Sequence, residues 1–112
     1  MITITVVLDD TGLLKSCDVR GHAGAGKQGH DIVCAAVSVL VRTAQTVLSG
    51  RKDITARSEA PGRGIFSLET QAHSQAGQDF LAAAGSFLVE GLQSVAGEYP
   101  GNCVMTIKQW RN

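Results

Sequence analysis

Residues 31–50 of the chain read DIVCAAVSVLVRTAQTVLSG and carry the clearest structural signal in the sequence. Apolar side chains recur there with the 3.6-residue period of an α-helix. Asp31 stands where an N-cap acceptor belongs, because its carboxylate can accept the unpaired N–H groups of the first turn, and Gly50 is expected to end the helix. Cys34 then falls in the first turn. The predicted buried stripe consists of Val33, Ala36, Val37, Leu40, Val41, Ala44, Val47 and Leu48.

The residues before this helix predict a β-hairpin. Apolar and polar side chains alternate over residues 2–8, which is the period of a half-buried strand. A turn is expected at residues 9–12, where the sequence reads DDTG, and a second strand at about residues 13–20. The next stretch, residues 21–29, lacks any large apolar side chain and is predicted to be a mobile loop. Its four glycines are Gly21, Gly24, Gly26 and Gly29.

The residues after the helix predict a second hairpin, a second helix and a last strand. Strands are expected at residues 53–59 and 64–70 around a turn at 60–63, and a helix at about 74–95 that ends at Gly97 and Pro100. The last strand begins near Cys103. The order ββαββαβ predicts an α+β fold with two helices packed on a largely antiparallel sheet. The expected inward side of the second helix comprises Leu81, Ala84, Leu88, Leu92 and Val95.

The composition limits the class of protein. A chain of 112 residues with 44% hydrophobic side chains suits a single soluble domain. Ten basic and ten acidic side chains cancel, so no general cationic field is present to hold nucleic acid or an anionic membrane. The alternating N-terminus is not a signal peptide, and three widely spaced cysteines do not make a disulfide framework. We therefore expect a cytoplasmic protein with free thiols and no membrane partner.

Cys34 is the candidate for chemistry. The positive end of a helix favours a thiolate, and a nearby histidine can take and return a proton. His22 is preferred to His30 and His73, because it stands at the end of a strand and is linked to Cys34 by one loop. A cysteine on a helix is often only a small buried hydrophobe, and this alternative stays open, although Cys34 lies at the edge of the apolar stripe. Cys17 and Cys103 occupy inward strand positions.

Two other kinds of site are not favoured in this region. Residues 21–28, GHAGAGKQ, match the start of a phosphate-binding loop, but Gln28 stands where Ser or Thr must hold magnesium. His30 and Cys34 are four residues apart, but His30 precedes the helix cap, and no paired-ligand pattern of a metal site is present. The sequence therefore predicts neither a cofactor nor a metal.

Gly21-His22-Ala23, followed by a glycine-bearing loop and by residues 29–38, GHDIVCAAVS, resembles the ribosomal-processing cysteine protease family called Prp. The resemblance covers nearly the whole chain, so residues 1–112 are expected to form a single cysteine protease domain. It implies an endopeptidase that removes the N-terminal extension of a large-subunit ribosomal protein. Cys34 and His22 match the family's catalytic dyad, and Asp31 and Ser38 match supporting residues.

The resemblance also implies a homodimer and a mobile substrate loop between His22 and Cys34. The mechanism then predicts attack by the Cys34 thiolate, with the first-turn amides of the helix as oxyanion donors. Asp31 either caps the helix or orients His22. The alternative function is a non-catalytic ribosome-assembly module that binds the same extended peptide without cutting it.

Overall fold

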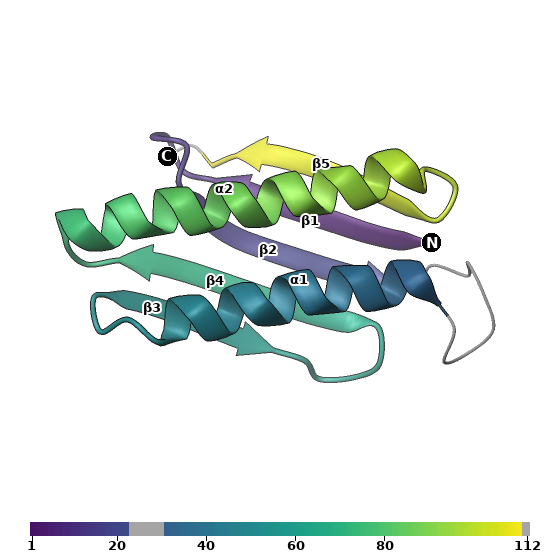
Figure 1. Ribbon diagram of the computed structural model, residues 1–112, viewed down its shortest axis with the longest axis horizontal. Coiled ribbons are helices and arrows are strands. Elements are labelled where there is room, and N and C mark those ends of the chain that lie inside the picture. Colours follow the sequence, from purple (N-terminus) through teal and green to yellow (C-terminus); the bar gives the residue numbers. More distant parts are fainter. Residues whose placement is uncertain (23–30, 111–112) are drawn as a thin grey trace.

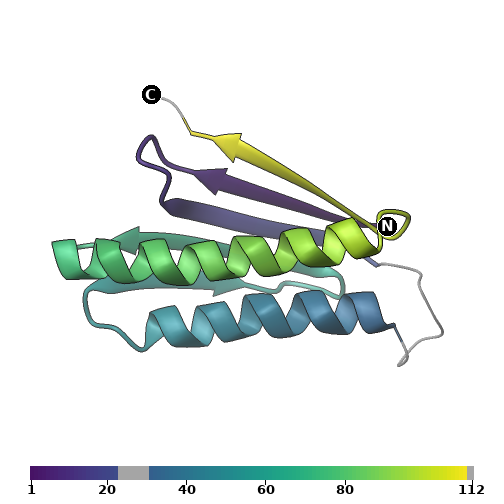
Figure 2. The ribbon, with the colours of Figure 1, turned by 45° about the horizontal axis from the view of Figure 1, so that its top comes forward.

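In the computed structural model, which describes residues 1–22 and 31–110, five strands form one sheet and two helices cover one of its faces (Figure 1). This arrangement confirms the predicted ββαββαβ order and the α+β class. A view turned by 45° shows the two helices side by side on the same side of the sheet (Figure 2). The elements are β1 (Ile2–Leu8), β2 (Leu14–Gly21), α1 (Ile32–Ser49), β3 (Ile54–Glu59), β4 (Ile65–Ala72), α2 (Gln75–Glu98) and β5 (Cys103–Gln109).

The sheet is mixed, with the strand order β3-β4-β2-β1-β5. Among the described strands, only β1 and β5 pair in parallel; the three other pairs of neighbouring strands are antiparallel, as the prediction of a largely antiparallel sheet requires. Ile2 pairs with both Gly21 and Cys103, and Arg20 pairs with Ile65. The register therefore brings the start of β1, the end of β2 and the start of β4 together at one end of the sheet.

The core lies between the helices and the sheet. Alternate side chains of β1 and β2 are buried, among them Ile2, Ile4 and Cys17. From α1, four side chains of the predicted stripe are fully buried: Val33, Val37, Val41 and Leu48. Val47, which we expected in the stripe, is instead 44% exposed, because it is turned by about 100° from Leu48 around the helix axis.

The second helix is longer than the sequence predicts. Ser74 caps it by accepting a hydrogen bond from the Gly77 N–H, but the helix continues through Gly97 to Glu98. The prediction that Gly97 ends it is wrong: a glycine lowers helix stability by only about 1 kcal/mol and does not stop hydrogen bonding. The Tyr99 N–H still donates to the Val95 carbonyl, and Pro100 follows.

The turn between β1 and β2 is held by one carboxylate. Asp9 Oδ1 accepts hydrogen bonds from the Thr11 N–H, the Thr11 hydroxyl and the Leu13 N–H. Gly12 completes the turn with φ +89°, a conformation that side-chain-bearing residues avoid. This turn lies at the far end of β1 from Ile2.

Both helices are long and apolar enough, by length and composition alone, to cross a membrane. Core helices of soluble domains also satisfy this criterion, and each helix here packs a buried stripe toward the sheet. The two helices also approach each other closely: a Cβ on Gly91 would lie 2.8 Å from a methyl carbon of Leu40. Packing within the domain thus accounts for the buried stripe of each helix, whereas Val39 on α1 and Phe87 on α2 stay exposed.

Candidate active site

The first turn of α1 is fixed by Asp31. Its Oδ1 accepts hydrogen bonds from the Val33 N–H at 3.1 Å and the Cys34 N–H at 3.0 Å, which confirms the predicted N-cap. Its second oxygen, Oδ2, accepts a hydrogen bond from Cys34 Sγ at 3.3 Å. One carboxylate therefore holds both the backbone and the thiol of Cys34.

Cys34 differs from the two other cysteines in its access to solvent. Cys17 and Cys103 are 0% and 2% exposed, as predicted for inward strand positions, whereas Cys34 is only partly buried at the edge of the core. Burial raises the pKa of the Cys17 thiol to about 12 and also raises the pKa of Cys103. A deeply buried thiol resists ionisation and cannot reach a substrate. Of the three thiols, Cys34 alone is placed for nucleophilic chemistry.

His22 directly follows β2 and is held by its neighbours. Its backbone carbonyl accepts a hydrogen bond from the Met1 amino group. Its imidazole lies against the turn that leads into β4: a Cβ on Gly64 would lie 3.0 Å from His22 Nε2. Gly64 has φ +70°, and its carbonyl accepts a hydrogen bond from the Gly21 N–H at 2.7 Å. The imidazole of His22 therefore packs against the β3–β4 hairpin at Gly64.

Cys34 and His22 line the same hollow, a cavity of about 380 Å³ between α1 and the end of the sheet, which we call the Cys34 groove. Ser38, one helical turn after Cys34, lines it too, so three of the four predicted site residues line one hollow. The other lining residues are Ile2, Val19, Gly21, Val37, Val41, Arg42, Ala60, Gly62, Arg63, Gly64, Ile65 and Phe66. A largely apolar wall beside a thiol and an imidazole suits an extended peptide.

Gly21 is a correction to the predicted loop. It is the last residue of β2, paired with Ile2, and has φ +97°. A Cβ at this position would lie 2.3 Å from the Met1 carbonyl oxygen, so the sheet end leaves room only for glycine. The other loop glycines, Gly24, Gly26 and Gly29, lie outside the described residues, and so does His30.

Three amides at the start of α1, where oxyanion donors were predicted, already have hydrogen-bond partners within the helix turn. The N–H groups of Val33 and Cys34 donate to the Asp31 carboxylate, and the Ala35 N–H donates to the Asp31 carbonyl. An N–H group that is satisfied by a cap is not aimed at a reacting carbonyl. These three N–H groups are therefore engaged in the substrate-free helix turn, and the oxyanion contact stays a prediction.

His73, one of the two other candidate bases, does not line the groove. Its ring Nε2 is 2.7 Å from the Thr55 hydroxyl oxygen. Its backbone N–H donates to the Asp53 backbone carbonyl. Asp53 also accepts from Ser74 and forms an ion pair with Arg51. These contacts tie the start of β3 to the start of α2, which is a structural role.

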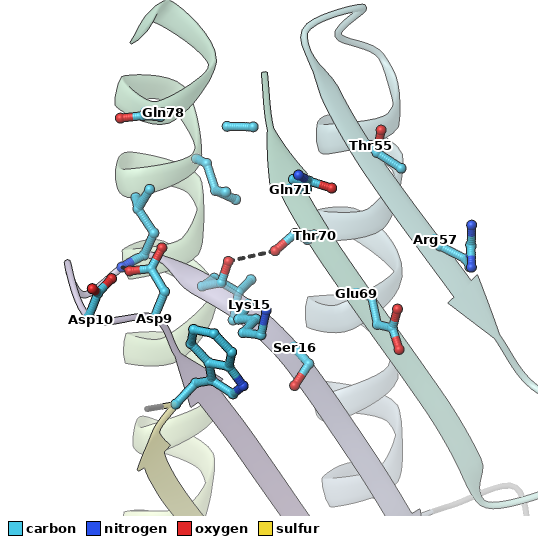
Figure 3. Close-up of a pocket in the computed structure, with 15 residues that line it drawn as sticks. Asp9, Asp10, Lys15, Ser16, Thr55, Arg57, Glu69, Thr70, Gln71 and Gln78 are labelled. Carbon is cyan, nitrogen blue, oxygen red and sulfur yellow. Dashed lines mark hydrogen bonds between the residues drawn. The ribbon is translucent and has the colours of Figure 1, made fainter. Parts of the chain in front are cut away.

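A larger cavity, of about 770 Å³, lies at the opposite end of the sheet (Figure 3). Polar and charged side chains line it, including Asp9, Lys15 and Arg57, and the Lys15 ammonium lies 4.4 Å from the centre of the Trp110 ring. No cysteine or histidine is among the described residues of its wall. Its size therefore does not make it the place of thiol chemistry.

Sequence reasoning missed the hairpin side of the Cys34 groove. Gly64, Phe66 and Arg63 reach it from the β3–β4 hairpin, some thirty residues beyond Cys34 along the chain. Arg42 was also missed, although its spacing of eight residues from Cys34 along the predicted helix was a usable signal. Within residues 1–22 and 31–110, no group of three or more His, Cys, Asp or Glu side chains is arranged to hold a metal ion.

Residues 1–104 match the protein family described as cysteine protease Prp. The ribosomal processing cysteine protease Prp of Staphylococcus aureus is 29% identical over 112 residues, which cover 96% of this chain and all of the relative. The Prp proteases of two strains of Staphylococcus aureus match this chain with the same identity and coverage.

Solved structures agree with this match. The Staphylococcus aureus Prp protease in complex with a covalently linked product peptide superposes with a TM-score of 0.83 at 25% identity, over 96% of this chain and 100% of that one. A Streptococcus mutans protein superposes with a TM-score of 0.79 at 27% identity, over 98% of this chain and 96% of that one. The five-stranded sheet and two helices are thus a shared fold.

Proposed function

The chain belongs to the cysteine protease Prp family, and on this premise we propose that Cys34 is its nucleophile and that His22 is its general base and acid. The observation that carries the proposal is the Cys34 groove, where the one partly exposed thiol and a histidine line the same hollow. The function follows as peptide-bond hydrolysis in the processing of ribosomal proteins.

The proposed reaction has two halves. His22 takes the proton of the Cys34 thiol, and the sulfur attacks the scissile carbonyl carbon to form a tetrahedral intermediate. The C–N bond then breaks, the imidazolium gives its proton to the departing amine, and a thioester remains on Cys34. His22 next removes a proton from water, whose oxygen attacks the thioester and releases the carboxylate product and the thiol.

Asp31 acts in this scheme as a positioning residue. Its carboxylate caps α1 and accepts a hydrogen bond from Cys34 Sγ, so the resting thiol is held at a defined place. That hydrogen bond has to break before the sulfur attacks, because the proton must pass to His22. The contact therefore favours a role in placing Cys34 over a role in orienting His22.

Ser38 supplies a hydroxyl to the same groove. It is exposed, and it makes no hydrogen bond to any other part of the chain that the structure describes. A serine that bonded back to its own helix would be a purely local feature. Since this one does not, we assign its hydroxyl to the bound peptide, as a donor to a carbonyl oxygen near the scissile bond.

The substrate we propose is the N-terminal extension of a large-subunit ribosomal protein. Three observations support a peptide substrate of this kind: the family's description, the relative named for ribosomal processing, and the solved relative that carries a covalently linked product peptide. The alternative of a binding module that does not cut is disfavoured by the same comparisons, because they name a protease.

The test is an incubation of the purified protein with a synthetic peptide that spans the junction of extension and mature ribosomal protein. Mass spectrometry should show two product peptides with the wild type and none with Cys34→Ala or His22→Ala, while all three proteins give the same circular dichroism spectrum. A tight complex without products would support the binding module instead. Full cleavage by Cys34→Ala would exclude the proposed nucleophile.

The cellular setting completes the proposal. We place the protein in the cytoplasm, where its three free thiols suit a reducing environment and ribosomal proteins are present.

We also propose a homodimer that makes no direct contact with nucleic acid. Phe87 and Val39 are 77% and 63% exposed on the helices, and such apolar side chains are available to a protein partner. Light scattering of the purified protein gives the oligomeric state directly.

A further inference from the structure

The Cys34 groove runs along α1 rather than ending at the thiol. Cys34, Ser38 and Arg42 all line it and follow each other at intervals of four residues, which places them on one face of the helix. Arg42 is eight residues beyond Cys34, so it lies about 12 Å further along the axis at a rise of 1.5 Å per residue. An extended peptide that lies in the groove therefore passes the arginine after it passes the thiol.

The described wall of the groove contains cationic side chains and no anionic one. Two cationic side chains, Arg42 and Arg63, line it, and no Asp or Glu is present among the described residues of its wall. The Asp31 carboxylate lies close to the Cys34 end but is occupied by the backbone cap and the thiol. Arg42 is therefore a cationic side chain in the wall of the groove where a peptide would lie.

Apolar side chains share the wall of the groove with Arg42. Val37, Val41 and Phe66 line the same hollow, and an arginine beside such a surface keeps its guanidinium available while its stem packs. A guanidinium with this placement recognises a carboxylate through paired N–H donors, more strongly than it recognises an amide.

From this geometry we propose that Arg42 is a specificity residue, which selects substrates with an acidic side chain about three or four residues from the scissile bond. The spacing follows from the 12 Å between the two helix positions and the rise of about 3.3 Å per residue in an extended peptide. This inference rests on the proposed function, because it places the scissile bond at Cys34.

The experiment uses synthetic peptides that span the extension junction of the cell's own ribosomal protein. Each peptide carries Asp or Asn at one position, from five residues before the scissile bond to five residues after it. At low salt, Asp should raise kcat/KM over Asn by about three- to tenfold at one position three or four residues from the cut, and the ratio should shrink as salt is added. A ratio near one at every position would overturn the proposal.

Three variants assign the preference to Arg42. Arg42→Gln should abolish the ratio, and Arg42→Glu should reverse the selectivity, so that Lys at the same position is preferred to Asn. Arg57→Gln is the matched control, because Arg57 is an exposed cation on β3 that does not line the Cys34 groove. An unchanged ratio in Arg42→Gln would overturn the proposal even if the wild type shows the preference.

A binding measurement separates this inference from the proposed function. Fluorescently labelled Asp and Asn peptides are titrated with the Cys34→Ala variant, and the same preference is expected in Kd. If the wild type cleaves no peptide but Arg42 still selects the Asp peptide, the protease function fails and the specificity residue stands. If the wild type cleaves the peptides without any selection by charge, the protease function stands and the assignment of Arg42 as a specificity residue fails.

Discussion

Gly64 offers the sharpest test of how the hairpin positions His22. Two features oppose a side chain there: its φ of +70°, which costs an alanine about 1 to 2 kcal/mol, and the distances of 3.0 Å from its added Cβ to the Gly21 carbonyl oxygen and to His22 Nε2. The Gly21 carbonyl belongs to the sheet, so the imidazole is the group that gives way. Gly64→Ala should therefore both destabilise the protein and displace His22.

The expected size of each effect follows from these contacts. A loss of about 1 to 2 kcal/mol in a domain of this length lowers Tm by about 3 to 10 °C. A shift of the imidazole by a few tenths of an ångström should lower kcat/KM by about three- to thirtyfold, since misplacement by about 1 Å can cost about a hundredfold. Thermal unfolding by circular dichroism and peptide cleavage well below Tm measure the two effects on the same preparation.

Gly12→Ala is the control for backbone strain alone. Gly12 has φ +89°, nothing lies within 4 Å of its added Cβ, and it belongs to the β1–β2 turn at the other end of the sheet. It should lose a similar amount of stability and keep the wild-type kcat/KM. If Gly64→Ala also keeps the wild-type kcat/KM, the imidazole resting on Gly64 does not take part in the reaction, and the assignment of His22 fails.

Two further predictions concern Asp31, which caps α1, and Asp53, which accepts a hydrogen bond from the α2 cap Ser74. Asp31→Ala should lower the free energy of unfolding by about 1 kcal/mol, because two N–H groups lose their acceptor. Asp31→Asn keeps an oxygen for both N–H groups and should stay close to wild type in urea titrations. Equal losses of stability in the two variants would contradict the cap. Hydrogen bonds from Arg51 and Ser74 lower the pKa of Asp53 from 3.8 to about 2. A carboxyl group whose pKa is lowered by folding stabilises the fold at pH values above its pKa in the unfolded chain, so stability should fall as pH drops from about 4 to about 2. Asp53→Asn should flatten the plot of stability against pH over this range. An equal slope in wild type and variant would contradict a contribution of Asp53.

The parts of the structure that sequence predicted are those set by short-range rules. Strand alternation located β1, and Asp31 three residues before Cys34 located the cap, because both patterns depend on neighbours within one turn or one strand. The helix end at Gly97 was wrong because packing and the Tyr99 hydrogen bond outweigh a weak local propensity.

The site was predictable on one side only. Cys34 and Ser38 share a helix face, and His22 directly follows a strand, so their types and spacing pointed to them. Gly64 and Phe66 enter the groove through the pairing of β4 with β2, and no local pattern specifies which strands become neighbours. The first-turn amides show a related limit: the sequence identified the cap, but not which N–H groups its carboxylate would bind.

The central claim is that the Cys34 thiol attacks the substrate. A peptide from the N-terminal side of the extension junction, ending in a chloromethyl ketone, reports this directly when the treated protein is digested and mapped by mass spectrometry. We predict one adduct per chain, on Cys34 and not on the buried Cys17 or Cys103, with activity lost in proportion to the adduct and no adduct in Cys34→Ala. Loss of activity while Cys34 remains unmodified would contradict the account.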